Sequence, residues 1–325
     1  MLAIVSPGQG SQKPGMLLPW LEVEGLAALA ARFTAAAELD LVRLGTTADA
    51  DEIKDTAVTQ PLVVASALLA ASTLALPASA VTAGHSVGEL AAAAVAGVID
   101  PEAAVRTAGI RGAAMGRACA ITPTGMSAVL GGDTDAVLAA LEALDLVGAN
   151  VNGGGQVVAA GSIEALAALA AAPPAGARVI PLPVAGAFHT QYMAAARDAL
   201  HAALSGITTA DPARPLLTNS DGSVVASGSV YLELLTAQVT RPVRWDLCMA
   251  TLGRLGVTGV LELPPAGTLV GLIKRDLKGV ATLALKTPDD LDKAAAFIEE
   301  HSGASGISTA APNGPASNST VRSNA

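Results

Sequence analysis

The stretch SAVTAGHSVGELAAAAVA, residues 79–96, joins a short apolar run to an alanine-rich run through a serine flanked by glycines. Its first six residues predict a buried strand, and the apolar spacing from Leu90 to Ala96 predicts a helix. The G-x-S-x-G motif between them is typical of a nucleophile elbow, where glycines permit a sharp turn and Ser86 is presented above a sheet. The helix N-terminus beside it favours negative charge. An ordinary glycine-rich turn is the alternative interpretation of the motif.

Strands alternate with helices on both sides of this stretch, which indicates an α/β fold with a mostly parallel sheet. One helix start is clear, because Asp100 and Pro101 suit the N-cap and the first position of a helix. This helix is expected to extend to about Cys119. Further strands are predicted at 2–5, 216–219 and 259–263, and further helices at 61–76 and 193–204.

The pattern changes between about residues 125 and 187, where strands and helices alternate in the order β-α-β-α-β. We expect a small inserted subdomain there, with the larger subdomain in two segments, 1–124 and 188–300. Residues 302–325 contain one charged residue and two large apolar ones, which cannot offset the entropy of ordering. A disordered tail is therefore predicted at 301–325. The inserted strands are predicted at 126–130, 156–160 and 178–182, and the inserted helices at 136–144 and 163–171.

The composition excludes several classes of protein. Hydrophobic residues make up 51% of the 325-residue chain and charged residues only 14%, which argues against disorder over most of its length. The formal net charge is −9 and aromatic residues make up 2%, so nucleic acid is an unsuitable partner. The two cysteines lie far apart and offer neither a disulfide framework nor a metal motif.

The run from Thr56 to Gly84 contains no charged residue and is long enough to span a bilayer. Pro61 and Pro77 interrupt it, however, and its last residues predict a strand. We therefore expect a buried helix and strand rather than a membrane-spanning segment. The N-terminus lacks the basic region of a signal peptide, so a cytoplasmic protein is predicted.

A serine nucleophile needs a base, and the chain has four histidines. His189 lies between a predicted strand and a predicted helix, on a loop of the kind that carries catalytic residues. His85 adjoins the serine but should point away from it on a tight turn, His201 falls within a predicted helix, and His301 adjoins the predicted tail. His189 is therefore the candidate general base for Ser86.

A third motif, Pro7 to Gln12, follows the first predicted strand. It is neither a dinucleotide fingerprint nor a P-loop, because the third glycine of the former and the Gly-Lys-Ser/Thr ending of the latter are missing. Two glycines around Gln9 let the backbone approach a ligand closely. The Gln9 amide or its backbone N–H is thus a candidate donor to an oxyanion. Taken alone, the motif is equally compatible with a plain turn.

Together, Gly8–Gln12, Gly84–Glu89 and Gly186–His189 resemble the motifs of the malonyl-CoA:acyl carrier protein transacylases of bacterial fatty-acid synthesis. The resemblance covers about residues 2–285, and the alanine-rich texture is similar to that of actinobacterial members. It implies a large α/β-hydrolase-like subdomain with a parallel sheet and a small inserted ferredoxin-like subdomain. It also implies that malonyl-CoA is the substrate, that an acyl carrier protein is the partner, and that no cofactor or metal is needed.

The resemblance also implies roles for the candidate catalytic residues. Ser86 would be the nucleophile that accepts the acyl group, and His189 would be its base. The backbone carbonyl of Gln238 would orient His189 in place of the usual carboxylate. Gln9 and the backbone N–H of Val87 would form the oxyanion hole.

The same resemblance implies a malonyl-binding pocket. Arg111 would bind the malonyl carboxylate, for which a planar guanidinium offers two parallel hydrogen bonds. Asn152 and Phe188 would line the pocket. Similar polyketide-synthase domains that select malonyl often have phenylalanine before the histidine and lack glutamine after the serine. Phe188 and Val87 fit that pattern, so malonyl is expected rather than methylmalonyl.

An acidic enzyme needs a local basic patch to bind an acyl carrier protein, because the carrier is itself acidic. Lys274, Arg275 and Lys278 cluster on one predicted helix, with positions 274 and 278 on the same face. We expect these three residues to help dock the carrier, with a solvated helix face as the alternative. Arg241 and Arg244 are a second candidate patch, and a monomer is the expected state.

Other functions stay open at this point. A serine esterase or thioesterase of the α/β-hydrolase class shares the G-x-S-x-G motif, but it needs an acidic residue and then a late histidine after the serine. A polyketide-pathway acyltransferase and a catalytically silent carrier-binding module are further alternatives. The joint presence of the candidate nucleophile, base, oxyanion donor and arginine argues against the silent module.

Overall fold

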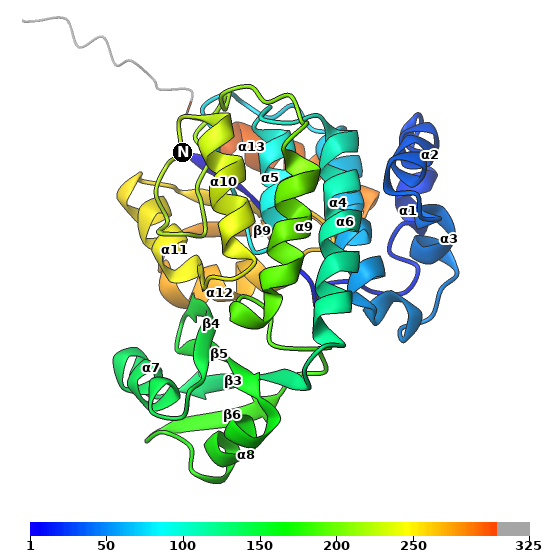
Figure 1. The fold of residues 1–325 in the computed structure, drawn as a ribbon. Coiled ribbons are helices and arrows are strands. Elements are labelled where there is room, and N and C mark those ends of the chain that lie inside the picture. The colour runs from blue at the N-terminus through cyan, green and yellow to red at the C-terminus, as the bar shows by residue number, and fades with distance from the viewer. Residues whose placement is uncertain (304–325) are drawn as a thin grey trace, which may run out of the picture.

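The computed structural model describes residues 1–303, which form two α/β parts, each built on its own sheet (Figure 1). The first sheet contains four parallel strands: β1 (Leu2–Ser6), β2 (Val81–Gly84), β8 (Gly259–Glu262) and β9 (Ala281–Ala284). Their order is β2-β1-β8-β9, so β1 and β8 are central and pair on both edges. All five residues of β1 are buried, as expected for a parallel strand covered on both faces.

Helices cover both faces of this sheet, because alternate side chains of β1 enter two different apolar clusters. Leu2 and Ile4 belong to the larger cluster, and Ala3 and Val5 belong to the smaller one. The larger cluster includes residues of α2 (Leu26–Ala37), α4 (Thr56–Ala71), α5 (Gly88–Val95), α6 (Pro101–Cys119), α9 (Ala194–Leu204), α10 (Gly228–Gln238) and α13 (Leu291–His301). The smaller cluster includes residues of α11 (Trp245–Arg254) and α12 (Thr268–Asp276).

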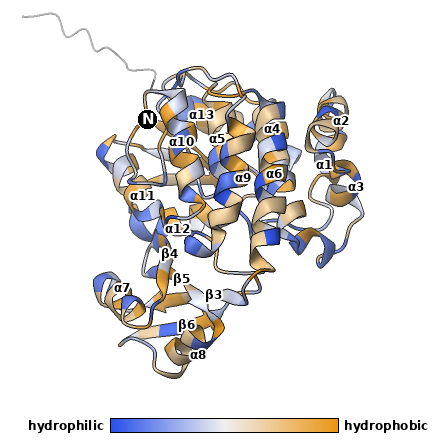
Figure 2. Ribbon diagram, viewed as in Figure 1, coloured by the Kyte–Doolittle hydropathy of each residue, from blue (hydrophilic) through white to orange (hydrophobic). Residues whose placement is uncertain are grey.

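Helix α4 accounts for the uncharged run in the sequence. It lies in the centre of the larger part and is mostly hydrophobic (Figure 2). Asp55 caps its start by accepting a hydrogen bond from the Ala57 N–H at 2.8 Å, and Pro61 lies inside the helix rather than ending it. A helix buried on nearly all sides has no need of a polar face. No helix among residues 1–303 is long and apolar enough to cross a membrane.

The second sheet is mixed and lies below the first in the view of Figure 1. Its strands are β3 (Thr124–Gly131), β4 (Val147–Gly153), β5 (Gln156–Ser162), β6 (Ala177–Pro181) and β7 (Val243–Arg244), in the order β6-β3-β5-β4-β7. The first four pair antiparallel, and β7 adds a parallel edge from a distant part of the chain. Two helices, α7 (Thr134–Glu142) and α8 (Ile163–Ala171), enclose a third apolar cluster against this sheet.

Most predicted elements are confirmed, with ends shifted by a few residues. Asp100 caps α6 by accepting a hydrogen bond from the Ala103 N–H at 2.8 Å, and α8 has the predicted bounds. The strand predicted at 216–219 is wrong, because that segment makes only single bridges before it turns. The elements not predicted from the sequence include the four helical segments before α4, the helices α10, α11 and α13, and the strands β4, β7 and β9. The remaining elements are α1 (Leu18–Leu21), α3 (Leu41–Thr46), η1 (Glu52–Lys54), η2 (Gln191–Met193) and η3 (Pro288–Asp290).

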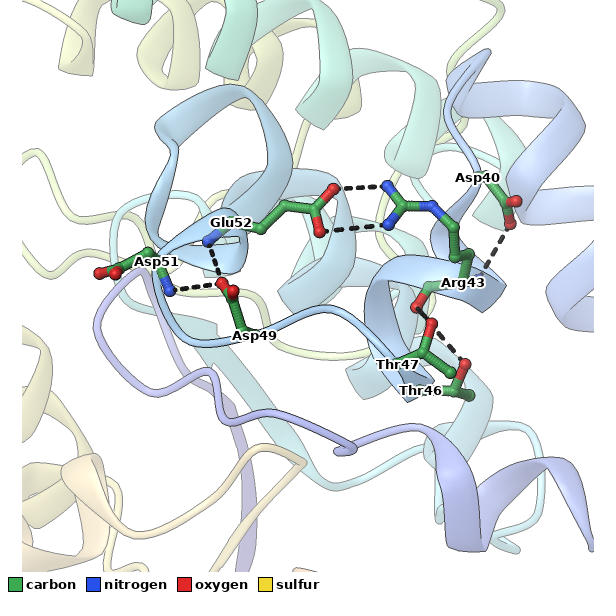
Figure 3. A network of polar contacts seen from close by, with 7 residues as sticks. All are labelled: Asp40, Arg43, Thr46, Thr47, Asp49, Asp51 and Glu52. Atoms are coloured by element: carbon green, nitrogen blue, oxygen red, sulfur yellow. Dashed lines mark hydrogen bonds and ion pairs between the residues drawn. The ribbon is translucent and has the colours of Figure 1, made fainter.

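A polar network connects α3 to η1, just before α4 begins (Figure 3). The Arg43 guanidinium donates two hydrogen bonds to the Glu52 carboxylate, at 3.1 and 2.5 Å. Asp40 caps α3 by accepting from the Arg43 N–H, and Asp49 accepts from the N–H groups of Asp51 and Glu52. An exposed ion pair adds little stability, but this two-pronged contact defines the path of the loop that leads to α4.

The predicted tail lies mainly outside the described residues. Its first position, His301, is the last residue of α13 and is buried, so the helix extends past the predicted boundary at 300. The His301 Nδ1 and the Thr258 Oγ1 are 2.9 Å apart, and this contact holds the end of the helix beside β8.

Candidate active site

Ser86 lies at a sharp turn between β2 and α5, in the context that the sequence predicts for an elbow. Its backbone is left-handed, with a φ of 54°, which is uncommon for a residue other than glycine. The flanking glycines leave no room for side chains. A Cβ atom on Gly84 would lie 2.1 Å from the carbonyl carbon of Gly88, and one on Gly88 would lie 2.3 Å from the carbonyl oxygen of Ser6. The close approach of these backbones makes the turn possible.

His189 contacts Ser86 and lies on a loop between β6 and α9. Its Nε2 lies 2.7 Å from the Ser86 Oγ, and its Nδ1 lies 2.9 Å from the carbonyl oxygen of Gln238. A carbonyl only accepts, so Nδ1 carries the proton and Nε2 is free to accept the serine proton. Burial, and then the positive charge of Arg111, lower the pKa of His189 to about 3. The imidazole is therefore neutral near pH 7, the form that a general base requires.

Two residues beside Ser86 have backbone N–H groups that are candidates for an oxyanion hole. The residues Gln9 and Val87 both line the cavity beside Ser86, and within residues 1–303 neither N–H has a protein acceptor. Val87 also lies at the start of α5, where the helix dipole favours negative charge. The side-chain amide of Gln9 donates instead to the Thr56 Oγ1 at 3.2 Å, so the backbone N–H is the group of Gln9 that can reach an oxyanion.

Arg111 brings a buried positive charge to the same cavity from α6. It is only 1% exposed, and its Nη1 donates to the Gln60 Oε1 at 2.7 Å. Its Nη2 lies 3.3 Å from both the Ser86 Oγ and the Gln238 Oε1. Burial lowers the pKa of Arg111 to about 10, so the guanidinium stays charged near pH 7. A buried cation beside a serine hydroxyl can bind an anionic group of a substrate.

The cavity has a volume of about 200 Å³ and lies between the two sheets, because side chains from both parts line it. Asn152 of β4 and Phe188 both line it, as the sequence predicts. The His85 Nε2 lies 2.8 Å from the Asn152 Oδ1, and the His85 ring packs edge-on against Trp245. His85 thus contacts the second sheet and α11 rather than the serine hydroxyl.

Three polar residues around Ser86 were missed by the sequence analysis. Gln60 accepts from Arg111, Asn219 accepts from the Ser86 N–H at 2.8 Å, and the buried Glu89 accepts from the Asn219 N–H. Glu89 is the one polar side chain in the apolar helix α5, a signal that was available from the sequence. Asn219 lies 133 residues from Ser86 and gives no such local signal.

The predicted docking cations are exposed and do not line the cavity. Lys274 and Arg275 lie in the last turn of α12, but Lys278 lies two residues beyond its end. The expectation that 274 and 278 share one helix face is therefore wrong, because the helix stops first. The Lys278 Nζ instead donates to the carbonyl oxygen of Lys274 at 3.3 Å.

The other candidates lie away from Ser86 or have partners of their own. His201 is exposed on α9, and Arg244 forms an ion pair with Asp246 at 2.7 Å. No group of three histidine, cysteine, aspartate or glutamate side chains within residues 1–303 is arranged to hold a metal ion.

A serine, a neutral histidine and a buried arginine meet in one cavity on an α/β scaffold, which defines the class as an acyl-transfer enzyme. The chain belongs to the acyltransferase family described as "Acyl transferase domain", whose model matches residues 4–299. This match spans both sheets and every candidate site residue.

Individual relatives are similar over nearly the whole chain. The malonyl CoA-acyl carrier protein transacylase of Mycobacterium tuberculosis is 56% identical over 300 residues, which cover 91% of this chain and 99% of that protein. A crystal structure of MCAT from the same organism has a TM-score of 0.87 at 54% identity, covering 91% and 99% of the two chains. A malonyl-transacylase in complex with a type II PKS acyl-carrier protein has a TM-score of 0.84 at 30% identity, covering 91% and 99%.

Proposed function

We propose that this chain transfers a malonyl group from malonyl-CoA to the phosphopantetheine thiol of an acyl carrier protein, through a malonyl ester on Ser86. One observation carries the proposal: the Ser86 Oγ is within reach of both the His189 Nε2, at 2.7 Å, and the Arg111 Nη2, at 3.3 Å. A nucleophile, a base and an anion-binding group thus share one cavity. The malonyl transacylases among the relatives support the same reaction over an esterase.

In the first half-reaction, the Ser86 Oγ attacks the thioester carbonyl while the His189 Nε2 takes its proton. The tetrahedral intermediate then collapses, the carbon–sulfur bond breaks, and His189 returns the proton to the departing CoA thiolate. The carbonyl of Gln238 favours the imidazolium that forms in between, because it accepts from Nδ1. The product of this step is a malonyl-serine ester and free CoA.

In the second half-reaction the carrier's thiol is the nucleophile and the Ser86 Oγ is the leaving group. The phosphopantetheine thiol gives its proton to His189 and attacks the malonyl ester, and the Ser86 Oγ leaves and regains the proton. Ping-pong kinetics follow, because CoA departs before the carrier reacts.

We assign the oxyanion hole to the backbone N–H groups of Gln9 and Val87. The support is that both residues line the cavity and neither N–H has a protein acceptor within residues 1–303. Hydrogen bonds to a developing oxyanion lower the barrier, and a single donor of this kind contributes roughly 3–4 kcal/mol.

Arg111 is proposed to bind the malonyl carboxylate. The side chain is charged, buried and adjacent to Ser86, and Gln60 holds it in place. Phe188 and Val87 occupy the positions that favour malonyl over methylmalonyl in similar domains, and Asn152 also lines the cavity. An uncharged acyl group would leave the arginine without an anionic partner.

We further propose that the carrier docks on Lys274, Arg275 and Lys278. The support is that α12 lines the active-site cavity through Leu269 and Leu272, carries the exposed Lys274 and Arg275 in its last turn, and is followed by the exposed Lys278. The carrier's acidic surface would then lie next to the route to Ser86.

The same proposal includes a division of the chain. Residues 1–124 and 188–300 would form an α/β-hydrolase-like subdomain, and residues 125–187 a smaller ferredoxin-like one, with the cavity between them. We also propose a cytoplasmic monomer without a cofactor or metal, since serine and histidine supply the nucleophile and the proton transfer. Either fatty-acid synthesis or a polyketide pathway would use the product.

The test is to incubate the full chain with malonyl-CoA and follow its intact mass. We expect a malonyl adduct on Ser86 that transfers to a phosphopantetheinylated carrier protein when the carrier is added. Rapid release of free malonate would indicate a hydrolase, and the absence of an adduct would indicate a silent module.

A further inference from the structure

Glu89 is a buried carboxylate that the proposed reaction does not use. It lies on α5, three residues after Ser86, and it is 1% exposed. Its Oε1 accepts from the Asn219 N–H at 2.7 Å, and its Oε2 accepts from the Gln238 Nε2. Burial raises the pKa of Glu89 to about 8, while the hydrogen bond from Asn219 and the charge of Arg111 lower it. A carboxylate in such a place is costly unless its partners require it.

The first contact leads to the nucleophile. The Asn219 Oδ1 accepts from the Ser86 N–H at 2.8 Å, and the Asn219 Nδ2 donates to the carbonyl oxygen of Gly84 at 2.7 Å. One amide side chain therefore holds both sides of the left-handed turn. Glu89 fixes the backbone of that asparagine, so it acts on the turn through one intermediate residue.

The second contact leads to the base and the arginine. The Gln238 Nε2 donates to Glu89 and, at 3.0 Å, to the Asn219 Oδ1. The Asn219 Oδ1 is an amide oxygen and can only accept. Gln238 therefore directs its amide nitrogen toward Asn219 and Glu89, and its Oε1 toward Arg111, 3.3 Å away. The backbone carbonyl of the same glutamine accepts from the His189 Nδ1.

We propose that Glu89 is a positioning residue that holds the nucleophile, the base and the arginine in one geometry through Asn219 and Gln238. This inference rests on the proposed function and deepens it. Together with Asn219, Glu89 favours the orientation of the Gln238 amide in which the oxygen, rather than the NH₂ group, faces Arg111. It thereby contributes to the preference for acyl groups that carry a carboxylate, although it does not touch the substrate.

The test compares covalent loading of the full chain by malonyl-CoA and by acetyl-CoA in the wild type and in Glu89→Gln. The substituted side chain keeps its shape but replaces one acceptor oxygen with an NH₂ group. It can therefore no longer accept from both the Asn219 N–H and the Gln238 Nε2, and the Gln238 amide beside Arg111 loses one of its two anchors. We expect kcat for malonyl loading to fall by about 10- to 100-fold. We also expect the malonyl-to-acetyl preference to fall by about 10-fold, because acetyl loading needs no arginine.

Glu262→Gln is the matched control. Glu262 is equally buried, and it accepts from the N–H groups of Gly267, Leu269 and Val270 at the start of α12. It has no contact with Asn219, Gln238 or Arg111 within the described chain. Its substitution should lower the thermal midpoint while leaving the malonyl-to-acetyl preference at the wild-type value.

If Glu89→Gln does not fold, Gln238→Met tests the role of the Gln238 amide, through which Glu89 would act on Arg111. Methionine removes the amide but keeps the carbonyl that orients His189, so malonyl loading should fall by a larger factor than acetyl loading, and the malonyl-to-acetyl preference should decrease. An unchanged preference in a folded variant of either kind would overturn this inference. A wild-type chain that forms no malonyl adduct would overturn the proposed function instead, so the two failures are distinguishable.

Discussion

The Ser86 Oγ lies 2.7 Å from the His189 Nε2, and both residues hold a left-handed backbone, with φ of 54° and 60°. A left-handed backbone costs free energy at a residue other than glycine, so surrounding contacts must hold Ser86 and His189 in this conformation. At Ser86 the Asn219 side chain accepts from the backbone N–H, and at His189 the carbonyl of Gln238 holds the imidazole. The backbone strain therefore lies at the two residues whose side chains must exchange a proton.

Ser86→Ala is expected to remove the malonyl adduct and to lower malonyl transfer by at least about 10⁴-fold, because no other hydroxyl takes the place of Oγ. Intact mass and a carrier-loading assay measure the two effects. Ser223→Ala, an exposed serine on the way to α10, is the control and should load normally. A malonyl adduct of wild-type yield on Ser86→Ala would place the nucleophile elsewhere.

Arg111→Ala is expected to lower kcat/KM for malonyl-CoA by about 100-fold while affecting acetyl-CoA far less, because only malonyl has a carboxylate to bind. Arg106→Ala changes an exposed arginine of the same helix and should alter neither value. Competition between the two thioesters in one mixture gives the ratio directly. Wild-type selectivity in Arg111→Ala would show that another group recognises the carboxylate.

The pH dependence of acylation tests the environment of His189. Its pKa of about 3 means that the imidazole stays neutral, and thus basic, well below the ordinary histidine value of 6.5. The acidic limb of kcat/KM should accordingly lie below pH 6.5, measured with a small uncharged ester so that substrate binding does not depend on the arginine.

Removing a nearby positive charge should raise that pKa, since the Arg111 cation disfavours the imidazolium. Arg111→Ala should consequently move the acidic limb upward, toward 6.5, and Arg106→Ala should leave it in place. A limb that stays fixed in both variants would mean that burial alone sets the basicity of His189.

Local patterns explain how much of the site could be predicted. The elbow at Ser86 depends on glycines within two residues of it, and the base on a loop histidine, so short motifs were sufficient for both. Strand β4 was missed because glycine and asparagine occupy four of its seven positions, a composition typical of turns. Tertiary pairing with β5 and β7 overrides that preference.

Long-range contacts explain what was not predicted. Asn219 reaches the elbow from 133 residues away, and no spacing in the sequence reveals the contact. The strand predicted at 216–219 was wrong for a related reason. The chain there forms a turn and supplies a hydrogen-bonding side chain, and it makes only isolated bridges instead of pairing along a neighbouring strand. Helix α4 shows a third case, in which close packing keeps Pro61 inside a helix that proline would otherwise end.

The elbow also predicts a stability effect. Gly84→Ala places a methyl group 2.1 Å from the backbone of Gly88, so the strand and helix must separate, at a cost of roughly 3 kcal/mol in the free energy of unfolding. Gly116→Ala in α6 meets nothing within 4 Å and should instead stabilise by about 0.5–1 kcal/mol. Urea denaturation measures both values. Equal stability of the two variants would contradict the close approach at the elbow.

Charge reversal tests the docking surface formed by Lys274, Arg275 and Lys278. These cations are exposed around the end of α12, and the other end of that helix lines the cavity. A chain with a net charge of −9 repels an acidic carrier unless such a patch faces it. Reversing all three to glutamate should raise KM for the carrier by roughly 10-fold, and more at low salt, where screening is weak.

A control separates the patch from net charge. Reversing Lys13, Lys286 and Lys293, which are exposed on other elements, changes the total charge equally and should leave KM for the carrier nearly unchanged. Loading from malonyl-CoA should be the same in both triple variants, because neither set touches the acyl cavity. If the two variants raise KM for the carrier to the same extent, the overall field of the protein governs docking and the end of α12 has no special part in it.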